Sequence, residues 1–169
     1  MKNIVLIGMP GSGKSTVGVV LAKMKGFHFL DSDLVIQDQE GRLLHEIIEQ
    51  EGNDGFLAVE DHINAGIVCE RTVIATGGSA VYGEQAMRHF REIGTVVYLK
   101  LSCRELAGRL GNLKGRGVVL KDGQTLKDLY DERTPLYEKY ANLIVDETGL
   151  DIEQTREQIE QRLQEYWNV

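Results

Sequence analysis

The stretch "NIVLIGMPGSGKST" at residues 3–16 decides the fold, because it joins an apolar run to a glycine-rich loop and a helical pattern. Gly8, Gly13, Lys14 and Ser15 match the pattern G-x-x-x-x-G-K-[ST]. In such a loop, backbone N–H groups and a helix N-terminus hold phosphates, the lysine reaches the β- and γ-phosphates, and the hydroxyl binds Mg²⁺. We therefore predict a nucleoside triphosphate site formed by Gly11, Ser12, Gly13, Lys14, Ser15 and Thr16.

Four further apolar runs are typical of strands. They lie at residues 27–31, 72–77, 95–101 and 142–146, and several are apolar at consecutive positions, which suits strands covered on both faces. Helical patterns separate the runs, at residues 14–25, 43–51, 56–70, 84–93, 103–110, 126–141 and 151–166. Strands that alternate with helices need crossover connections and so favour a parallel sheet. We expect a single domain over residues 1–169, with a three-layer α/β/α P-loop fold, a five-stranded parallel sheet and a lid loop.

The composition argues against several classes of protein. A net charge of −7 leaves no excess of Lys and Arg to neutralise a nucleic acid or an anionic membrane surface. The four histidines show no metal-ligand spacing, and Cys69 and Cys103 lie in unlike contexts, which favours reduced thiols. The chain opens on a strand-like run, and no apolar stretch approaches the roughly 20 residues of a membrane span. We expect a cytoplasmic monomer that binds a small molecule, and neither nucleic acid nor membrane.

Two aspartates follow the second apolar run, in the string "FLDSDLVIQ" at residues 29–37. Asp31 and Asp33 are two apart, and such residues of a strand point to the same side, at the edge where a doubly wound sheet binds ligands. Two carboxylates beside a triphosphate would repel it unless one holds a metal and the other binds an acceptor hydroxyl, as phosphoryl transfer requires. We expect Asp31 to bind Mg²⁺ through water and Asp33 to take the hydroxyl proton, although either could instead cap a helix.

A nucleotide-dependent switch or ATPase without an acceptor is the alternative class. Its guanine-reading pattern N-K-x-D is absent, since "NLKG" at residues 112–115 lacks the acid. The string "DETG" at residues 146–149 has the form D-x-x-G, but it follows the last predicted strand, where a switch acid would not face the phosphates. The glycine-rich segment 111–124 reads either as a surface loop or as a lid over an active site.

Nearly the whole chain resembles the shikimate kinases, which are small P-loop kinases of the nucleoside-monophosphate-kinase type. The resemblance rests on "GMPGSGKST" (8–16), "DSD" (31–33), "GR" (41–42), Phe56 with Glu60, "TGGSAV" (76–81), "VVYL" (96–99), "RLGNLKGR" (109–116) and "ERTPLYEKYA" (132–141). The last string is the most specific after the glycine-rich loop, because such families carry R-x-P-L-Y-x-x-x-A there. The resemblance implies an ATP- and Mg²⁺-dependent kinase that phosphorylates a hydroxyl of a small hydroxylated acid, shikimate.

The resemblance also implies roles for single residues. The catalytic residues would be Lys14, Asp33 and Arg116, the last of them closing over the transferring phosphoryl group from the lid. Ser15 and Asp31 would serve the metal, and Arg109 would lie near the adenine. The acceptor would meet Asp33, Gly77, Gly78, Ser79 and Arg133, with Arg133 gripping its carboxylate, and the acceptor-binding segment would be residues 32–60. A planar, always-charged guanidinium suits both a carboxylate and a transition-state charge.

The acceptor half of the chain departs from the family pattern. The family carries F-R-x-x-E where this chain has "FLAVE" at residues 56–60, so Leu57 replaces a carboxylate-binding arginine. Ser79 replaces the third glycine of a G-G-G string, and the lid reads "RGVVL" at residues 116–120 in place of R-P-L-L. Two explanations stay open. Either a relocated cation (Arg42, Arg71 or Lys114) holds the carboxylate of shikimate, or the acceptor is a different small polyol or hydroxy acid.

Overall fold

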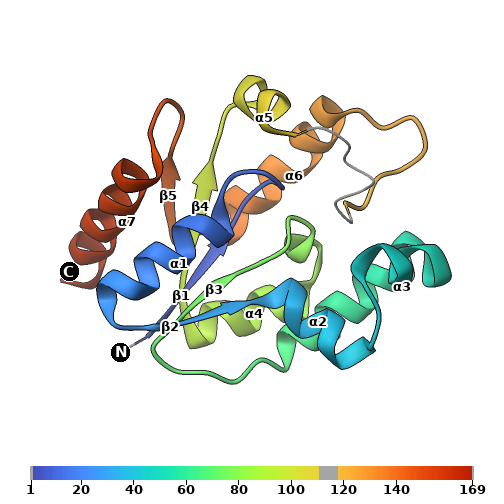
Figure 1. The fold of residues 1–169 in the computed structure, drawn as a ribbon, viewed down its shortest axis with the longest axis horizontal. Helices are drawn as coiled ribbons and strands as arrows, with labels where there is room; N and C mark the ends of the chain where they lie inside the picture. The colour runs from blue at the N-terminus through green and yellow to red at the C-terminus, as the bar shows by residue number, and fades with distance from the viewer. Residues whose placement is uncertain (1, 111–117, 169) are drawn as a thin grey trace.

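The computed structural model describes residues 2–110 and 118–168. Within them, five strands form one sheet in the order β2-β3-β1-β4-β5, and every neighbouring pair is parallel (Figure 1). The strands are β1 (Asn3–Ile7), β2 (His28–Asp31), β3 (Thr72–Ala75), β4 (Gly94–Lys100) and β5 (Leu143–Asp146). The predicted five-stranded parallel sheet is therefore confirmed.

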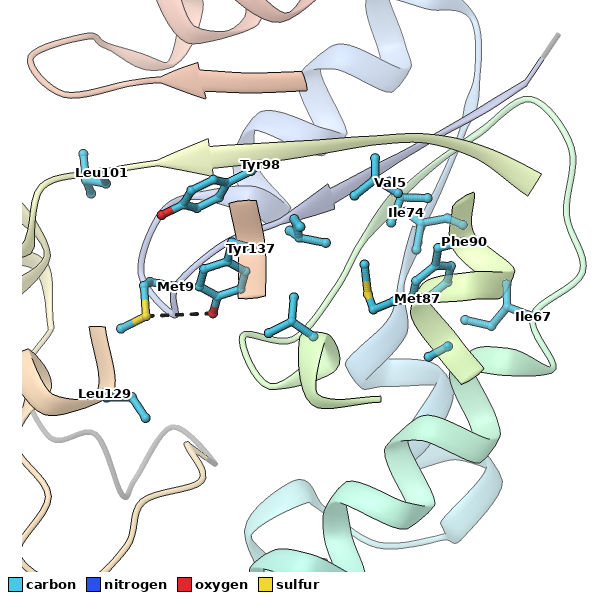
Figure 2. Packing of buried hydrophobic residues seen from close by; sticks show 14 of the residues in the cluster. Val5, Met9, Ile67, Ile74, Met87, Phe90, Tyr98, Leu101, Leu129 and Tyr137 are labelled. Carbon is cyan, nitrogen blue, oxygen red and sulfur yellow. Dashed lines mark hydrogen bonds between the residues drawn. The ribbon is translucent and has the colours of Figure 1, made fainter. Parts of the chain in front are cut away.

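Helices cover both faces of the sheet (Figure 1). They are α1 (Lys14–Lys25), α2 (Ser32–Glu40), α3 (Leu44–Ala65), α4 (Glu84–Ile93), α5 (Cys103–Arg109), α6 (Leu126–Tyr140) and α7 (Ile152–Trp167), with a 3₁₀ turn η1 (Ala80–Tyr82). Successive side chains of a strand point to opposite faces, so Leu6 packs with α1 and α7 while Val5 packs with α4 and α6. Figure 2 shows the core between the sheet and helices α4 and α6, where Val5 lies near Phe90 of α4. Strand β1 is apolar at consecutive positions because both of its faces are covered by helices.

None of the described helices combines the length and the apolar character needed to cross a membrane.

The structure differs from the sequence prediction at residues 32–40, which form helix α2. Asp31 ends β2 and caps this helix, because its Oδ1 accepts a hydrogen bond of 2.9 Å from the backbone N–H of Asp33. Asp33 therefore lies in the first turn of a helix, and the prediction that it shares a strand with Asp31 was wrong. The helix was missed because Ile36 is its single buried apolar residue, which leaves almost no helical periodicity to detect.

Helix α3 also ends earlier than predicted. The pattern at residues 56–70 predicts a helix to the end of that range, but the helix stops at Ala65. Ile67 continues into an irregular segment, where its side chain is 5% exposed and packs in the core beneath α4 (Figure 2). An apolar residue thus extends the apparent periodicity although its backbone is not helical. Gly52, with a φ of 73°, interrupts the helix between the two predicted segments.

The carboxyl ends of all five strands meet at one edge of the sheet, because the strands are parallel. The loop after β3 is tied to β1 there, since the backbone N–H and the hydroxyl of Thr76 both donate to the carbonyl of Leu6, at 3.2 and 2.8 Å. This contact lies immediately before the glycine-rich loop, and it brings segments more than sixty residues apart in sequence to one place.

Asn3 joins the amino ends of neighbouring strands, and it provides a test of the fold. Its buried amide donates to the carbonyls of Cys69 and Ile93 at 2.9 and 3.1 Å and accepts from the N–H of Thr72 at 3.0 Å. The substitution Asn3→Ala leaves these backbone groups without partners, and we expect it to lower the free energy of unfolding by about 2–4 kcal/mol. Urea unfolding followed by circular dichroism measures this loss.

The matched control is Asn168→Ala, at the exposed end of α7, which should change the unfolding free energy by less than about 0.5 kcal/mol. Equal unfolding midpoints for the two variants would contradict the role assigned to Asn3.

Candidate active site

A cavity of about 380 Å³ opens at the carboxyl edge of the sheet. It is lined by the glycine-rich loop and α1, by α2 and α3, by the segment after β3, and by α6. The lining residues are Pro10, Gly11, Gly13, Lys14, Ser15, Thr16, Asp33, Leu44, Phe56, Thr76, Gly77, Gly78, Ser79, Val118, Val119 and Arg133. Most of the residues proposed from the sequence therefore surround one space.

The glycine-rich loop needs glycine for geometric reasons. Gly8, Gly11 and Gly13 have φ angles of 152°, 81° and 86°, which side chains with a Cβ rarely allow. A Cβ on Gly8 would also lie 2.8 Å from the carbonyl oxygen of Leu99. The loop ends at the first residue of α1, so backbone N–H groups of the loop and of the helix N-terminus are available to an anion.

Lys14 is held in the centre of this loop. Its Nζ donates to the carbonyls of Gly8 and Met9, each at 2.8 Å. Burial lowers the pKa of Lys14 to about 8, although the nearby carboxylate of Asp33 opposes the shift. A bound phosphate would raise this pKa again, because an adjacent anion favours the charged ammonium.

Ser15 and Asp31 bring two oxygen ligands together. The hydroxyl of Ser15, in the first turn of α1, donates to Oδ2 of Asp31 at 3.3 Å. Mg²⁺ prefers oxygen ligands, keeps several waters and is commonly held by one or two protein groups together with substrate phosphates. Within residues 2–110 and 118–168, no group of three or more His, Cys, Asp or Glu side chains is arranged to hold a metal ion. The pair therefore fits a magnesium ion that is shared with phosphates.

Asp33, in the first turn of α2, lines the cavity and is partly buried. Desolvation raises its pKa to about 6, the charge of Asp31 adds to the shift, and Lys14 opposes it. A Cβ on Gly77 would lie 2.6 Å from Oδ1 of Asp33, so the absence of a side chain at Gly77 lets the carboxylate approach the backbone. At neutral pH this carboxylate is ionised and able to accept a proton from a hydroxyl.

Arg133 is a buried cation of the cavity wall, with a side chain that is only 1% exposed. One guanidinium nitrogen donates to the carbonyl of Val119 at 3.1 Å, and the group lies 5.4 Å over the ring of Tyr82. Its Nε has no hydrogen-bond partner among the described residues. No carboxylate of residues 2–110 or 118–168 forms an ion pair with this buried guanidinium, which therefore fits an anionic group of a bound molecule, and Arg133 is not a solvated helix charge.

Arg109 lies beside the glycine-rich loop and is not among the residues that line the cavity. Its guanidinium donates to the carbonyl of Gly11 at 3.3 Å and lies 3.5 Å from the carboxylate of Glu147. Sequence reasoning missed Glu147, which follows β5 and whose pKa burial raises to about 7. The remaining predicted catalytic residue, Arg116, lies outside the described residues, as do Lys114 and Gly117.

Glu60 lies behind the acceptor side of the cavity, on the buried face of α3. Its Oε1 is 2.7 Å from the hydroxyl oxygen of Ser79, and its Oε2 has no hydrogen-bond partner among the described residues. Burial raises the pKa of Glu60 to about 8. The sequence signal for this group was its spacing, since Glu60 falls at helical intervals between the buried Phe56 and Ile63.

Two of the three proposed relocated cations, Arg42 and Arg71, do not line the cavity, and the third, Lys114, lies outside the described residues. Arg42 pairs with the carboxylates of Glu40 and Glu51, at 2.6 and 3.0 Å. Arg71 precedes β3 and donates to the carbonyl of Gly26 at 3.2 Å, so it lies at the opposite edge of the sheet. Both suggestions were therefore wrong. Arg42 is paired with two neighbouring carboxylates, and Arg71 lies at the amino end of β3, away from the carboxyl edge where the cavity opens.

Comparison with known proteins agrees with this geometry. A family model described as shikimate kinase matches residues 10–164. The shikimate kinase of Thermodesulfovibrio yellowstonii is 36% identical over 162 residues, covering 94% of this chain and 93% of that protein. A solved shikimate kinase from Acinetobacter baumannii, in complex with shikimate, superposes with a TM-score of 0.85 at 31% identity, over 99% of this chain and 94% of the other.

The shikimate kinase of Aquifex aeolicus is a further similar structure, with a TM-score of 0.81 and 29% identity over 96% of each chain. Sequence motif, fold and cavity therefore agree, and the chain belongs to the shikimate kinase family of small-molecule kinases.

Proposed function

We propose that the protein transfers the γ-phosphoryl group of ATP to a hydroxyl of shikimate, with Mg²⁺, to give shikimate 3-phosphate. The observation that carries this proposal is that Lys14, Asp33 and Arg133 line one cavity. They provide a phosphate ligand, a proton acceptor and a carboxylate ligand, which are the groups that this reaction needs. The names of the relatives and the shikimate complex of the Acinetobacter baumannii enzyme support the choice of acceptor.

The nucleotide would occupy the glycine-rich loop. Gly11, Ser12, Gly13 and Thr16 would hold its phosphates together with Lys14, and Arg109 would lie near the adenine. Ser15 would hold Mg²⁺ directly and Asp31 through water. When bound, the ion would neutralise part of the phosphate charge.

The acceptor would lie between Asp33 and Arg133, against the backbone of Gly77, Gly78 and Ser79. Its hydroxyl oxygen forms a bond to the γ-phosphorus as the bond from that phosphorus to the bridging oxygen breaks. The electron pair of the broken bond leaves with ADP, and Asp33 takes the hydroxyl proton. Since Arg133 is buried and fixed by Val119, it can orient the acceptor as well as bind its charge.

The lid proposed for residues 111–124 would complete the site. Its described part already borders the cavity through Val118 and Val119. Leu120, the next residue, accepts a hydrogen bond of 2.8 Å from the side chain of Asn53 in α3. Residues 118–120 therefore lie close to the proposed acceptor site, and we propose that closure of the lid excludes water from the transferring phosphoryl group.

A second acceptor class is favoured by one observation at α3. Leu57 does not line the active-site cavity but a neighbouring one, together with Tyr82 and Glu132. Among the described residues, Arg133 is the one arginine that lines the active-site cavity, so the positive charge available to an acceptor there is small. A different hydroxy acid or polyol that needs less positive charge would also fit this wall.

An ADP-release assay tests the proposed function. We expect turnover with ATP and shikimate, with a KM for shikimate in the range of about 1 μM to 1 mM that is common for enzymes. Other hydroxy acids and polyols, assayed in parallel, should be poorer acceptors. Turnover of another acceptor without turnover of shikimate would support the divergent acceptor class, and a preference for GTP over ATP would contradict the kinase assignment.

The substitution Asp33→Asn tests the proton acceptor. We expect kcat to fall by roughly 10²–10⁴-fold, because an amide cannot take the hydroxyl proton, while ATP binding persists. Steady-state ADP release and ATP titration measure the two effects. The matched control is Asp38→Asn, on the exposed side of the same helix, which should keep full turnover. Unchanged kcat in Asp33→Asn would remove Asp33 from the mechanism.

A further inference from the structure

Glu60 is a buried carboxyl group whose surroundings stabilise a negative charge only weakly. Its side chain is 2% exposed, and one oxygen lies 2.7 Å from the Ser79 hydroxyl while the other has no partner among the described residues. Leu57, one turn earlier on α3, is apolar and offers no cation. An ionised carboxylate in such surroundings is costly, so the group takes up a proton instead.

The charges that face Glu60 come from three helices. Asp33 on α2 and Asp61 on α3 are negative, and Arg133 on α6 is positive. Burial is the largest influence and raises the pKa of Glu60 to about 8, while the Ser79 hydrogen bond and Arg133 oppose the rise. Glu60 is therefore mainly a neutral acid at pH 7.

The protonation state of Glu60 decides what Ser79 can do. A hydroxyl has one proton to donate, an ionised carboxylate only accepts, and a neutral carboxylic acid has an O–H of its own. When Glu60 is ionised, the proton of Ser79 is committed to Oε1. When Glu60 is neutral, its O–H can donate to the Ser79 oxygen, and the proton of Ser79 can point into the cavity.

Ser79 lies close enough to Arg133 to share a ligand with it. Both residues line the active-site cavity. Gly78 connects them, because a Cβ on Gly78 would lie 3.0 Å from a terminal nitrogen of Arg133, and Gly78 directly precedes Ser79 in the chain. An anionic group held by Arg133 would therefore lie beside the hydroxyl of Ser79.

We propose that Glu60 is a positioning residue that donates to Ser79, so that the Ser79 hydroxyl and Arg133 together bind the anionic group of the acceptor. This inference rests on the proposed function, and it names the second ligand of the acceptor carboxylate at a wall where Arg133 is the one arginine of the described residues. It also assigns a chemical role to the hydroxyl of Ser79, a group that a glycine at this position would lack.

The first test replaces the hydroxyl. We expect Ser79→Ala to raise the KM for shikimate about tenfold or more with a small change in kcat, because a hydrogen bond to a charged group is lost. The methyl ester of shikimate, which carries no negative charge, is the matched acceptor and should show a much smaller increase. Ser79→Gly serves as a second variant if the alanine variant does not fold.

The second test follows the proton on Glu60. In the wild type, the KM for shikimate should rise as pH increases through about 8. Glu60 then ionises, and the Ser79 hydroxyl donates its hydrogen bond to the carboxylate and no longer to the acceptor. In Glu60→Gln, the side-chain amide donates at every pH, so this rise should disappear. Lys14 titrates in the same range in the empty protein, but it contributes equally to both proteins and cancels in the comparison.

Glu132→Gln is the control for this second test. Its carboxylate accepts from the Tyr82 hydroxyl at 2.7 Å, and that hydrogen bond lowers the pKa of Glu132. Glu132 is therefore charged throughout the range from pH 7 to 9, and its removal should leave the shape of the wild-type profile intact.

A stability measurement separates this inference from the proposed function. Folded Glu60 keeps a proton that the unfolded chain releases above pH 4.5, so the free energy of unfolding should fall as pH rises from about 5 to about 8. The fall should be smaller in Glu60→Gln, and equal slopes would overturn the neutral acid. Wild-type inactivity with every carboxylate acceptor would contradict the proposed function, whereas an active wild type with an unchanged KM in Ser79→Ala would overturn the inference alone.

Discussion

The burial of ionisable side chains at the carboxyl edge of the sheet is the constraint on which the rest of the site depends. Lys14, Glu60 and Arg133 are each less than 10% exposed, and Asp33 is partly buried beside them. Each group loses water, so the pKa of the lysine falls and those of the acids rise. The buried cations Lys14 and Arg133 favour negatively charged ligands, which are the phosphates of a nucleotide and the anionic group of an acceptor.

The strand order makes this arrangement possible. With β1 between β3 and β4, the glycine-rich loop lies beside the segment that follows β3, and β2 delivers Asp31 and Asp33 from the outer side of β3. Tyr137 connects these loops to α6, because its hydroxyl donates to the carbonyl of Gly78 at 2.6 Å and lies 3.8 Å from the sulfur of Met9 (Figure 2). One turn of α6 separates Tyr137 from Arg133, so a displacement of this helix would affect the nucleotide and acceptor sides together.

The secondary structure could be predicted wherever one element buries a strong apolar pattern. All five strands were predicted to within a few residues. The central strands β1, β3 and β4 are covered on both faces and are therefore apolar at most positions, whereas the edge strands β2 and β5 are more exposed. Helix α2 could not be found in this way, since it buries a single apolar residue and is established by the cap at Asp31. The end of α3 was predicted too late because Ile67 is buried by tertiary packing and not by helical geometry.

The sequence by itself determined the phosphate loop, the parallel sheet and the identities of the charged residues, because these follow from local spacing and apolar pattern. Only the tertiary structure decided which of these charges meet. In the folded protein, Arg42 and Arg71 lie outside the proposed acceptor site, and Arg133 is buried in its wall. Glu60 lies within hydrogen-bond distance of Ser79. The reason is physical: burial and proximity set the charge state of a side chain, and both arise from packing between segments that are distant in the sequence.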